Sequence, residues 1–398
     1  MRRIFSIAAA GALVAAVAAP SAGADPLTVS PGTVISQNQF PPGCGGPTEG
    51  DFSGTAENPG ANFNYDDAEV EPWLAIRPNN AMDVAGMWQQ DRWSDGGAHG
   101  LVAAVSHDGG RTIALSVPHF SICAGGTPAN GGDFGRSSDP WASWAPNGDL
   151  WSISLSFDRT TTRNAVLVSR MRHGESSWSE PTTLKFDTSR AGIPLGNNFN
   201  DKESLTADPT DASGNLVYAV WDRIVSPNEN APATAFENAQ AFHGPTWFSR
   251  TTDGAAPIPT WETARPIYDP GTRDQTISNQ IIVLPDGTLV DGFMHLHSQV
   301  THHGALVKGS ADVQVIRSTD KGETWSNRAI TVAPVNAIGE RDPQPINCRP
   351  FITGNPACRI VRSDGVIIDL AVDTSSGSTP GGCTSRGRTT PTTRTATI

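Results

Sequence analysis

The chain of 398 residues lacks the signatures of several functional classes. Its five cysteines include no C-x-x-C pair, which argues against a metal knuckle or a redox dithiol. Gly-rich phosphate loops, a G-x-S-x-G elbow and nucleic-acid-binding modules are also absent. Basic residues are few, with 28 Lys and Arg against 40 Asp and Glu. The resulting formal charge of −12 disfavours nucleic acid and anionic membranes as partners.

Apolar runs that approach the length of a membrane span are missing after the N-terminal segment. Residues 1–24 combine Arg2 and Arg3, an apolar stretch over 4–19 and small residues at 22–24, which is typical of a secretory signal peptide. A membrane anchor is the alternative, but the apolar run is short and alanine-rich for a bilayer. We therefore expect a secreted, extracellular protein.

Cysteine pairs are expected in such a compartment. Cys348 and Cys358 are ten residues apart around a Pro-rich loop and form the first predicted disulfide. Cys44 and Cys123 then form the second, which leaves Cys383 without a partner. The alternative is that some of these residues remain free thiols.

A short motif recurs along the chain. Residues 315–326 read VIRSTDKGETWS, with the pattern S-x-D-x-G-x-T-W. Ser318 and Asp320 can accept backbone N–H groups of a tight turn, and Gly322 can adopt the positive φ that such a turn needs. The predicted structure is a β-hairpin closed by Trp325. Three weaker copies contain Ser106, Asp108, Gly110 and Thr112; Ser169, Gly174 and Trp178; and Ser249, Asp253, Gly254, Thr260 and Trp261.

Each copy follows a strand–turn–strand pattern, at residues 71–88, 139–155, 201–221 and 278–294. The units begin at 71, 139, 201 and about 275, and each contains four short strands. A repeat of this length with four strands per unit predicts a β-propeller. Most of the eleven Trp residues stand at repeat positions, where packing between blades or stacking on a sugar would explain them.

The motif resembles the Asp-box of bacterial neuraminidases, and residues 66 to about 375 resemble the sialidase superfamily. This resemblance implies an all-β, six-bladed propeller with an exo-glycosidase site at the centre of one face. In that family three arginines bind the sugar carboxylate, an Asp is the general acid/base, and a Tyr activated by a Glu is the nucleophile.

The predicted domains are a signal peptide (1–24), an irregular strap (25–65), the propeller (66–377) and a disordered Thr/Arg-rich tail (378–398). Residues 362–377 look like the opening of a fifth unit, whereas 378–398 contain no Leu, Val, Phe, Trp, Tyr or acidic residue. The propeller therefore looks truncated after the start of its fifth blade. Either the reading frame is lost near Ser378, or the tail is natural.

Family catalytic residues map onto this chain only in part. Arg92 and Asp95 match the second family arginine and the general acid, although a turn role for Asp95 and a scaffold role for Arg92 are the alternatives. Val70, followed by Glu71, stands where the family has its first arginine. None of the three tyrosines, Tyr65, Tyr218 and Tyr268, fits the nucleophile position.

Carboxyl side chains recur at the start of the first strand of successive units, at Glu71, Asp139, Asp201 and Glu203. Because the first strands line the channel of a propeller, these groups are candidates for substrate binding, hydrolysis of a neutral glycan or calcium binding. Strand capping and solubility are the alternatives. We expect no other cofactor.

Histidines are concentrated in one segment. His295 and His297 alternate on one predicted strand, with His302 and His303 close by. A zinc site is the alternative that these histidines raise, but no carboxylate or Cys lies at ligand spacing, so no metal site is predicted.

The function predicted from the sequence is a secreted sialidase-like exo-glycosidase that removes terminal sugars, sialic acid or a related sugar, from glycans. The alternative is a non-catalytic β-propeller that binds carbohydrate or protein. The expected partner is a glycan or glycoprotein, and a complete chain would be a monomer.

Overall fold

The computed structural model describes residues 34–41, 44, 64–93, 96–159, 161, 163–188, 198–225, 243–272, 274–300, 306–335, 367–373, 383–387 and 396–397. The chain divides into two units, Met1–Ile35 and Ser36–Ile398. The second unit contains every strand described below. Its described residues contain no helix with the length and apolar character of a membrane span.

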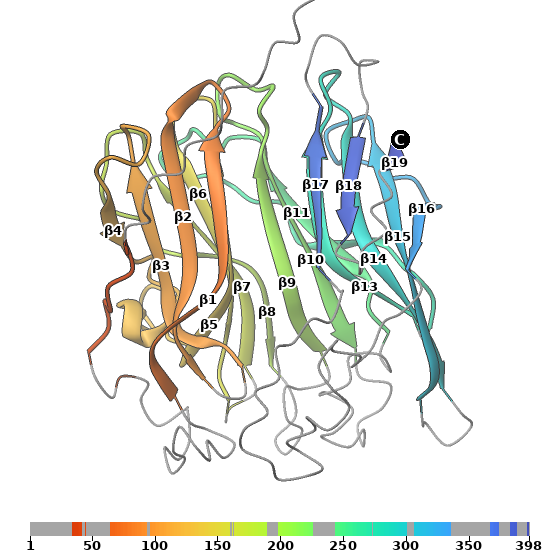
Figure 1. Cartoon of the computed structure of the whole chain (residues 1–398), viewed down its shortest axis with the longest axis horizontal. Coiled ribbons are helices and arrows are strands. Elements are labelled where there is room, and N and C mark those ends of the chain that lie inside the picture. The colour runs from red at the N-terminus through yellow and green to blue at the C-terminus, as the bar shows by residue number, and fades with distance from the viewer. Residues whose placement is uncertain are drawn as a thin grey trace, which may run out of the picture. The chain divides into compact units, whose positions relative to one another are not determined.

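The unit is all-β, with antiparallel pairing inside each sheet, as the sequence predicts (Figure 1). Each predicted repeat forms four strands in sequence order. The first group is β1 (Asn64–Arg77), β2 (Asn80–Trp93), β3 (Ala98–Ser106) and β4 (Ala114–Ser116); the second is β5 (Arg136–Trp144), β6 (Leu150–Phe157), β7 (Arg163–Met171) and β8 (Thr182–Thr188). The third is β9 (Asn198–Ala207), β10 (Val217–Val225), β11 (Thr246–Thr251) and β12 (Arg265–Tyr268); the fourth is β13 (Gln275–Val283), β14 (Leu289–Val300), β15 (Leu306–Ser318) and β16 (Ile330–Val335).

Three further strands follow, β17 (Ile368–Val372), β18 (Cys383–Gly387) and β19 (Ala396–Thr397). β17 contacts β13, as the opening strand of a fifth group would. β18 and β19 lie in the segment for which the sequence predicts disorder. Their pairing is between backbone groups, which requires no apolar side chains. Six blades and truncation remain predictions.

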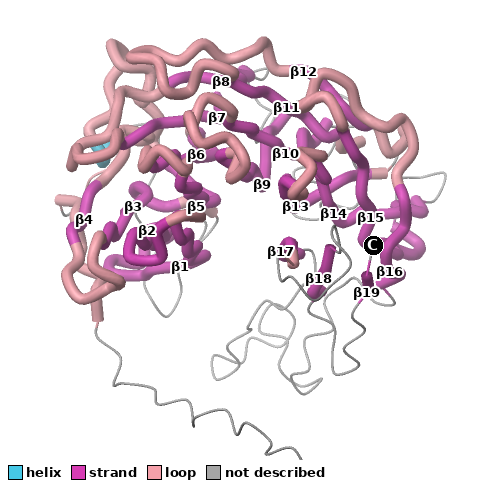
Figure 2. The backbone as a smooth tube through the Cα atoms, turned by 90° about the horizontal axis from the view of Figure 1, so that it is seen from above, coloured by secondary structure: helices cyan, strands magenta, loops and turns pink. Residues whose placement is uncertain are grey.

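Consecutive groups of strands contact each other through their first strands, β1 with β5, β5 with β9 and β9 with β13. Figure 2 shows these first strands on the same, inner side of their sheets. The first and second groups are also joined by one backbone pair, Ala98 with Ser137. The arrangement is that of successive propeller blades, and we call the four groups blades 1 to 4.

The core lies between blades. Ala142, Leu205 and Ile281 occupy equivalent positions on β5, β9 and β13, and each is at most 2% exposed because it packs against the preceding blade. Leu74 is the equivalent residue on β1, and it is 63% exposed. In the described part of the chain no blade precedes β1. The same apolar position is therefore buried in three blades and open in the first.

The motif turns close the outer hairpins as predicted. Asp320 accepts the Thr324 N–H at 2.9 Å and the Ser318 hydroxyl at 2.7 Å, while Ser318 Oγ accepts the Gly322 N–H at 2.8 Å. The copy at Asp108 makes equivalent bonds.

The assignments of two weaker copies were wrong by two residues. In the third copy Thr251, and not Ser249, donates to Asp253, at 2.7 Å. Ser249 instead binds the Glu262 carbonyl at 2.7 Å, and Ser169 binds the Ser179 carbonyl at 2.6 Å. The reason is that a Ser-Arg dipeptide precedes both turns, at 169–170 and 249–250, and its serine was taken for the serine of the motif.

Arginines connect neighbouring blades at these turns. Arg170 of blade 2 donates to the carbonyls of Gly254 and Ala256 in the turn of blade 3. Arg250 of blade 3 donates in the same way to the Lys321 carbonyl in the turn of blade 4. Charge-assisted bonds to backbone carbonyls fix each turn to the preceding blade.

Part of the N-terminal strap packs on blade 1. Phe40 is buried against Gly100, and the predicted Cys44–Cys123 disulfide is present, with a Cα–Cα distance of 5.6 Å. The predicted Cys348–Cys358 pair and the signal segment 1–24 lie outside the described residues.

We expect Leu205→Ala to lower the free energy of unfolding by about 2–5 kcal/mol, because it opens a cavity between blades. Leu74→Ala is the matched control, and we expect its effect to be small because the side chain is mostly exposed. Urea unfolding followed by tryptophan fluorescence measures both. Equal losses for the two variants would contradict the blade register.

Candidate active site

A backbone irregularity recurs at the same point of each first strand. Glu71, Asp139, Lys202 and Ser278 have φ values of 53°, 53°, 47° and 59°, and each lies at a break in the pairing register. Non-glycine residues with positive φ carry strain and concentrate at functional sites. A bulge of this kind re-aims a side chain out of the regular alternation. Repetition of the bulge on adjacent strands lets side chains from different blades meet.

Three blades contribute to one polar cluster at these bulges. The Lys202 Nζ lies 2.8 Å from Asp139 Oδ1 and 3.2 Å from Glu71 Oε1. The Lys202 backbone N–H donates to Asp139 Oδ2 at 3.2 Å and to Asp201 Oδ1 at 3.1 Å. Asp139 is also hydrogen-bonded to the carboxyl groups of Glu71 and Asp201. We call Glu71, Asp139, Asp201 and Lys202 the central cluster.

The carboxyl groups of the central cluster have pKa values shifted in different directions. Burial alone would raise the pKa of Asp139, but the Lys202 ammonium and several hydrogen bonds hold it well below its usual range. Burial and then the Asp139 charge raise the pKa of Asp201 to about 8. The same two causes raise the pKa of Glu71. Asp139 is therefore ionised near neutral pH, whereas Asp201 retains its proton.

Access to solvent differs within the central cluster. The side chain of Glu71 is 35% exposed and that of Asp139 is 6% exposed. Glu71 is thus the carboxyl group that faces the opening. Glu203, the fourth predicted carboxyl residue, is buried, and among the described residues its oxygens have no partner beyond their own backbone. Burial raises the pKa of Glu203 well above its usual range, which favours an uncharged, structural group.

Arg92 belongs to the edge of this site. It donates to Gln89 Oε1 at 3.0 Å, and Gln89 Nε2 donates to Glu71 Oε2 at 2.6 Å. The scaffold role for Arg92 rests on the recurrence of Asp-Arg at 91–92, 158–159 and 222–223. Arg92 faces Tyr65 across the strand pair, whereas Arg223 faces Asn200, so these two dipeptides are not at equivalent positions. The scaffold argument for Arg92 therefore fails. Asp95 lies outside the described residues.

Other arginines near the first strands have structural partners. Arg136 is fully buried, donates to the Gly96 carbonyl at 2.6 Å and lies over the Trp93 ring. Arg223 donates to Asp187 at 2.5 Å and lies over the Trp247 ring. These contacts use guanidinium groups that a sugar carboxylate would otherwise bind.

The tyrosines do not supply a nucleophile at the central cluster. Tyr218 is fully buried and donates to Asp208 at 2.9 Å; burial, together with the Asp208 charge, raises its pKa. Tyr268 lies on the outer strand β12. Tyr65 lies on β1, near its first residue Asn64.

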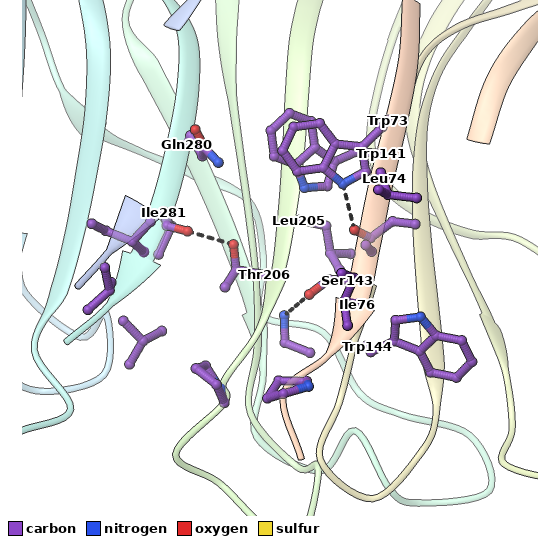
Figure 3. Close-up of a pocket in the computed structure, with 18 residues that line it drawn as sticks. Trp73, Leu74, Ile76, Trp141, Ser143, Trp144, Leu205, Thr206, Gln280 and Ile281 are labelled. Atoms are coloured by element: carbon purple, nitrogen blue, oxygen red, sulfur yellow. Dashed lines mark hydrogen bonds between the residues drawn. The ribbon is translucent and has the colours of Figure 1, made fainter. Parts of the chain in front are cut away.

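An apolar pocket follows the central cluster along the same strands. Trp73 stands two residues after Glu71, and Trp141 two residues after Asp139. Their rings stack with centroids 3.4 Å apart, and the Trp73 indole N–H donates to the Ala142 carbonyl at 2.9 Å (Figure 3). Further lining residues are Leu74, Ile76, Trp144, Leu205, Thr206, Gln280 and Ile281. Packing between blades is therefore one role of the repeated Trp residues. The polar central cluster consequently lies next to an apolar pocket along the same strands.

Sequence reasoning missed Lys202 as a member of the central cluster, although it lies between two predicted site residues. Alignment of the bulge positions would have found it, because Lys202 is the equivalent of Glu71 and Asp139. It also missed Asp274, which the fold brings to His295 and His297 from outside their strand.

Comparisons with known proteins give partial similarities. No family model and no curated protein matches the chain. Similar solved structures include an alpha-L-arabinanase of Penicillium chrysogenum complexed with arabinobiose, with 13% identity, 66% of each chain covered and a TM-score of 0.45. An alpha-L-arabinofuranosidase of Fusarium graminearum has 11% identity, coverage of 69% of this chain and 72% of that chain, and a TM-score of 0.44. Similarity at this level carries no conclusion on activity or substrate.

We expect Asp201→Asn to change the pH dependence of stability. Between about pH 4 and 8 folded Asp201 holds a proton that the unfolded chain releases, so the wild-type protein loses stability as pH rises. Asn cannot titrate. The stability of the variant relative to wild type should therefore rise across this range, by up to about 1.4 kcal/mol per pH unit.

Urea midpoints at pH 5 and pH 9 measure this change. Asp286→Asn is the control, because the pKa of this exposed turn residue is lowered and it is ionised throughout that range. A stability difference between Asp201→Asn and wild type that is the same at both pH values would refute the assignment.

Proposed function

We propose that the protein is a glycoside hydrolase that releases a terminal, neutral sugar from a glycan or glycoprotein. The central cluster carries this proposal, because it holds one ionised carboxylate beside carboxyl groups with raised pKa values. Carboxyl pairs whose environments push their pKa values apart are the usual acid and base of sugar hydrolysis.

Each residue then has a defined role. Glu71, the exposed carboxyl group, donates its proton to the glycosidic oxygen as the bond to the leaving group breaks. Asp139, kept ionised by Lys202, faces the positive charge that develops at the anomeric carbon. Asp201 donates a hydrogen bond to Asp139 and holds it in place. Water then forms the bond to the anomeric carbon and passes its proton to the Glu71 carboxylate, so that the released sugar carries a new hydroxyl group and Glu71 regains its proton.

The pairing of Lys202 with the carboxyl groups of the central cluster favours a neutral sugar over sialic acid. The three carboxyl groups of this cluster are accompanied by a single ammonium group, and Arg92 reaches Glu71 only through Gln89. The arginines that a carboxylate-binding clamp would need, such as Arg136 and Arg223, are engaged elsewhere. A carboxylate at the reaction centre would also repel an anionic substrate.

A non-catalytic carbohydrate- or protein-binding propeller is the second candidate. It is favoured by the mutual hydrogen bonding of the central cluster, which satisfies its carboxyl groups without a substrate. The two candidates differ in turnover, and the experiment below separates them.

We infer that the protein acts outside the cell. The Cys44–Cys123 disulfide supports this inference, because such bonds persist in oxidising compartments. The signal-like residues 1–24 lie outside the described part of the chain.

We expect the full chain to hydrolyse at least one neutral aryl glycoside in a panel of arabinofuranoside, xyloside, galactoside and sialoside substrates. Asp139→Asn should lower kcat by about 10²–10⁴-fold. Glu71→Gln should lower kcat strongly for a poor leaving group and weakly for dinitrophenol, which departs without protonation. Asp286→Asn, on an exposed turn, is the control.

Release of the sialoside alone would overturn the neutral-sugar assignment. No turnover by a chain shown to be folded by circular dichroism, together with glycan binding by calorimetry, would establish the second candidate. Equal losses for Glu71→Gln with both leaving groups would remove Glu71 from the role of proton donor.

A further inference from the structure

Two histidines of blade 4 face an aspartate contributed by the neighbouring strand. His295 and His297 alternate on β14 and therefore lie on the same face of the sheet. Asp274 immediately precedes β13, whose Thr276 pairs with His295. On the other side, Asp312 of β15 pairs with His295. Three segments of blade 4 thus converge on one group of side chains.

The distances in this group are those of potential metal ligands. Asp274 Oδ2 lies 3.0 Å from His295 Nε2 and 3.2 Å from His297 Nδ1. All three atoms lie within 4.8 Å of one another. Ligand atoms of a tetrahedral zinc ion stand about 3.3 Å apart, since each is about 2.0–2.1 Å from the metal. Small shifts would therefore enclose an ion.

The outer ring nitrogens of both histidines already have acceptors. His295 Nδ1 lies 3.0 Å from Gln314 Oε1, and the amide nitrogen of Gln314 donates to Thr331 Oγ1, which fixes the orientation of the amide. His297 Nε2 lies 2.9 Å from Asp312 Oδ2. Both outer nitrogens therefore carry hydrogen.

The other two ring nitrogens, His295 Nε2 and His297 Nδ1, both point at one carboxylate oxygen, Asp274 Oδ2. In neutral imidazoles, His295 Nε2 and His297 Nδ1 hold lone pairs, and they would meet the lone pairs of Asp274 Oδ2. Such an arrangement requires either a proton on each inner nitrogen or one cation between the three atoms. Gln314 and Asp312 occupy the places of the hydrogen-bond partners that orient metal-binding histidines.

We propose that Asp274, His295 and His297 form a binding site for a divalent transition-metal ion of the zinc type. Two imidazole nitrogens and one carboxylate oxygen suit Zn²⁺ or Co²⁺, whereas Ca²⁺ and Mg²⁺ prefer oxygen ligands alone. Three protein ligands leave a fourth position for water. The His297 and Asp274 side chains, 33% and 27% exposed, form the open side of the site.

The fold itself does not require histidines at this position. His295 follows Met294, which pairs with Ile277, one residue before the bulge at Ser278. In blade 3 the equivalent residue is Arg223, which pairs with an aspartate of the preceding blade. The same position in the sheet is therefore occupied by an arginine in blade 3 and by a histidine in blade 4.

Zinc binding to the full chain tests the proposal. We expect calorimetry to give one Zn²⁺ per chain, and Co²⁺ to give the visible absorption of a tetrahedral site with nitrogen ligands. Zn²⁺ should also raise the thermal midpoint of unfolding. His297→Ala and His295→Gln should abolish all three signals, and Asp312→Asn should weaken Zn²⁺ binding about 10–100-fold at unchanged stoichiometry.

His243→Ala is the matched control, because His243 forms a His–Asp pair with Asp269 but has no third ligand in the described residues. It should bind Zn²⁺ as the wild type does. Circular dichroism without metal confirms that each variant is folded. Absence of 1:1 binding by the wild-type chain would overturn the proposal, as would equal affinity in wild type, His297→Ala and His295→Gln.

Discussion

The central cluster depends on the ion pairs that the Lys202 ammonium group forms with Asp139 and Glu71. Glu71, Asp139 and Asp201 come from three different blades, and three carboxylates in contact would repel one another strongly at low exposure. Lys202 lies within 3.2 Å of two of them, and its backbone N–H binds the third. One fixed cation, together with the proton that Asp201 retains, thus permits three carboxyl groups to lie in contact.

Blade geometry determines which side chains can meet at that cation. Each first strand carries a positive-φ bulge, and consecutive first strands contact one another through buried apolar residues that follow the bulge. The apolar contacts set the spacing of the strands, while the bulges direct one side chain per strand toward its neighbours. Strain at the bulges is sustained because packing on both sides of each strand determines the backbone conformation.

The repeats and their strand order could be predicted from sequence, because turn chemistry and spacing are local properties. The Cys44–Cys123 bond joins residues 79 apart and was predicted only as the pair that remains after Cys348 and Cys358. Glu71 and Asp139 converge because a repeat places them at equivalent points, whereas Asp201 stands one residue before the equivalent position, which Lys202 occupies. Glu203 could not be distinguished from them, because a bulge reverses the alternation of facing that a regular strand would give. Asp274 was also beyond sequence reasoning, as its approach to His295 and His297 arises from strand pairing between distant residues.

The central cluster and the histidine group of blade 4 solve one electrostatic problem in two ways. In the central cluster the compensating cation is part of the chain, so it cannot leave, and the pKa values of Asp139 and Asp201 are shifted in opposite directions. In blade 4 the inner ring nitrogens of His295 and His297 face the Asp274 carboxylate, and protons on these nitrogens or an exchangeable ion would supply the compensating charge. A covalently fixed charge suits a site that needs a constant carboxylate. An exchangeable charge suits a site whose occupancy responds to the surroundings of the protein.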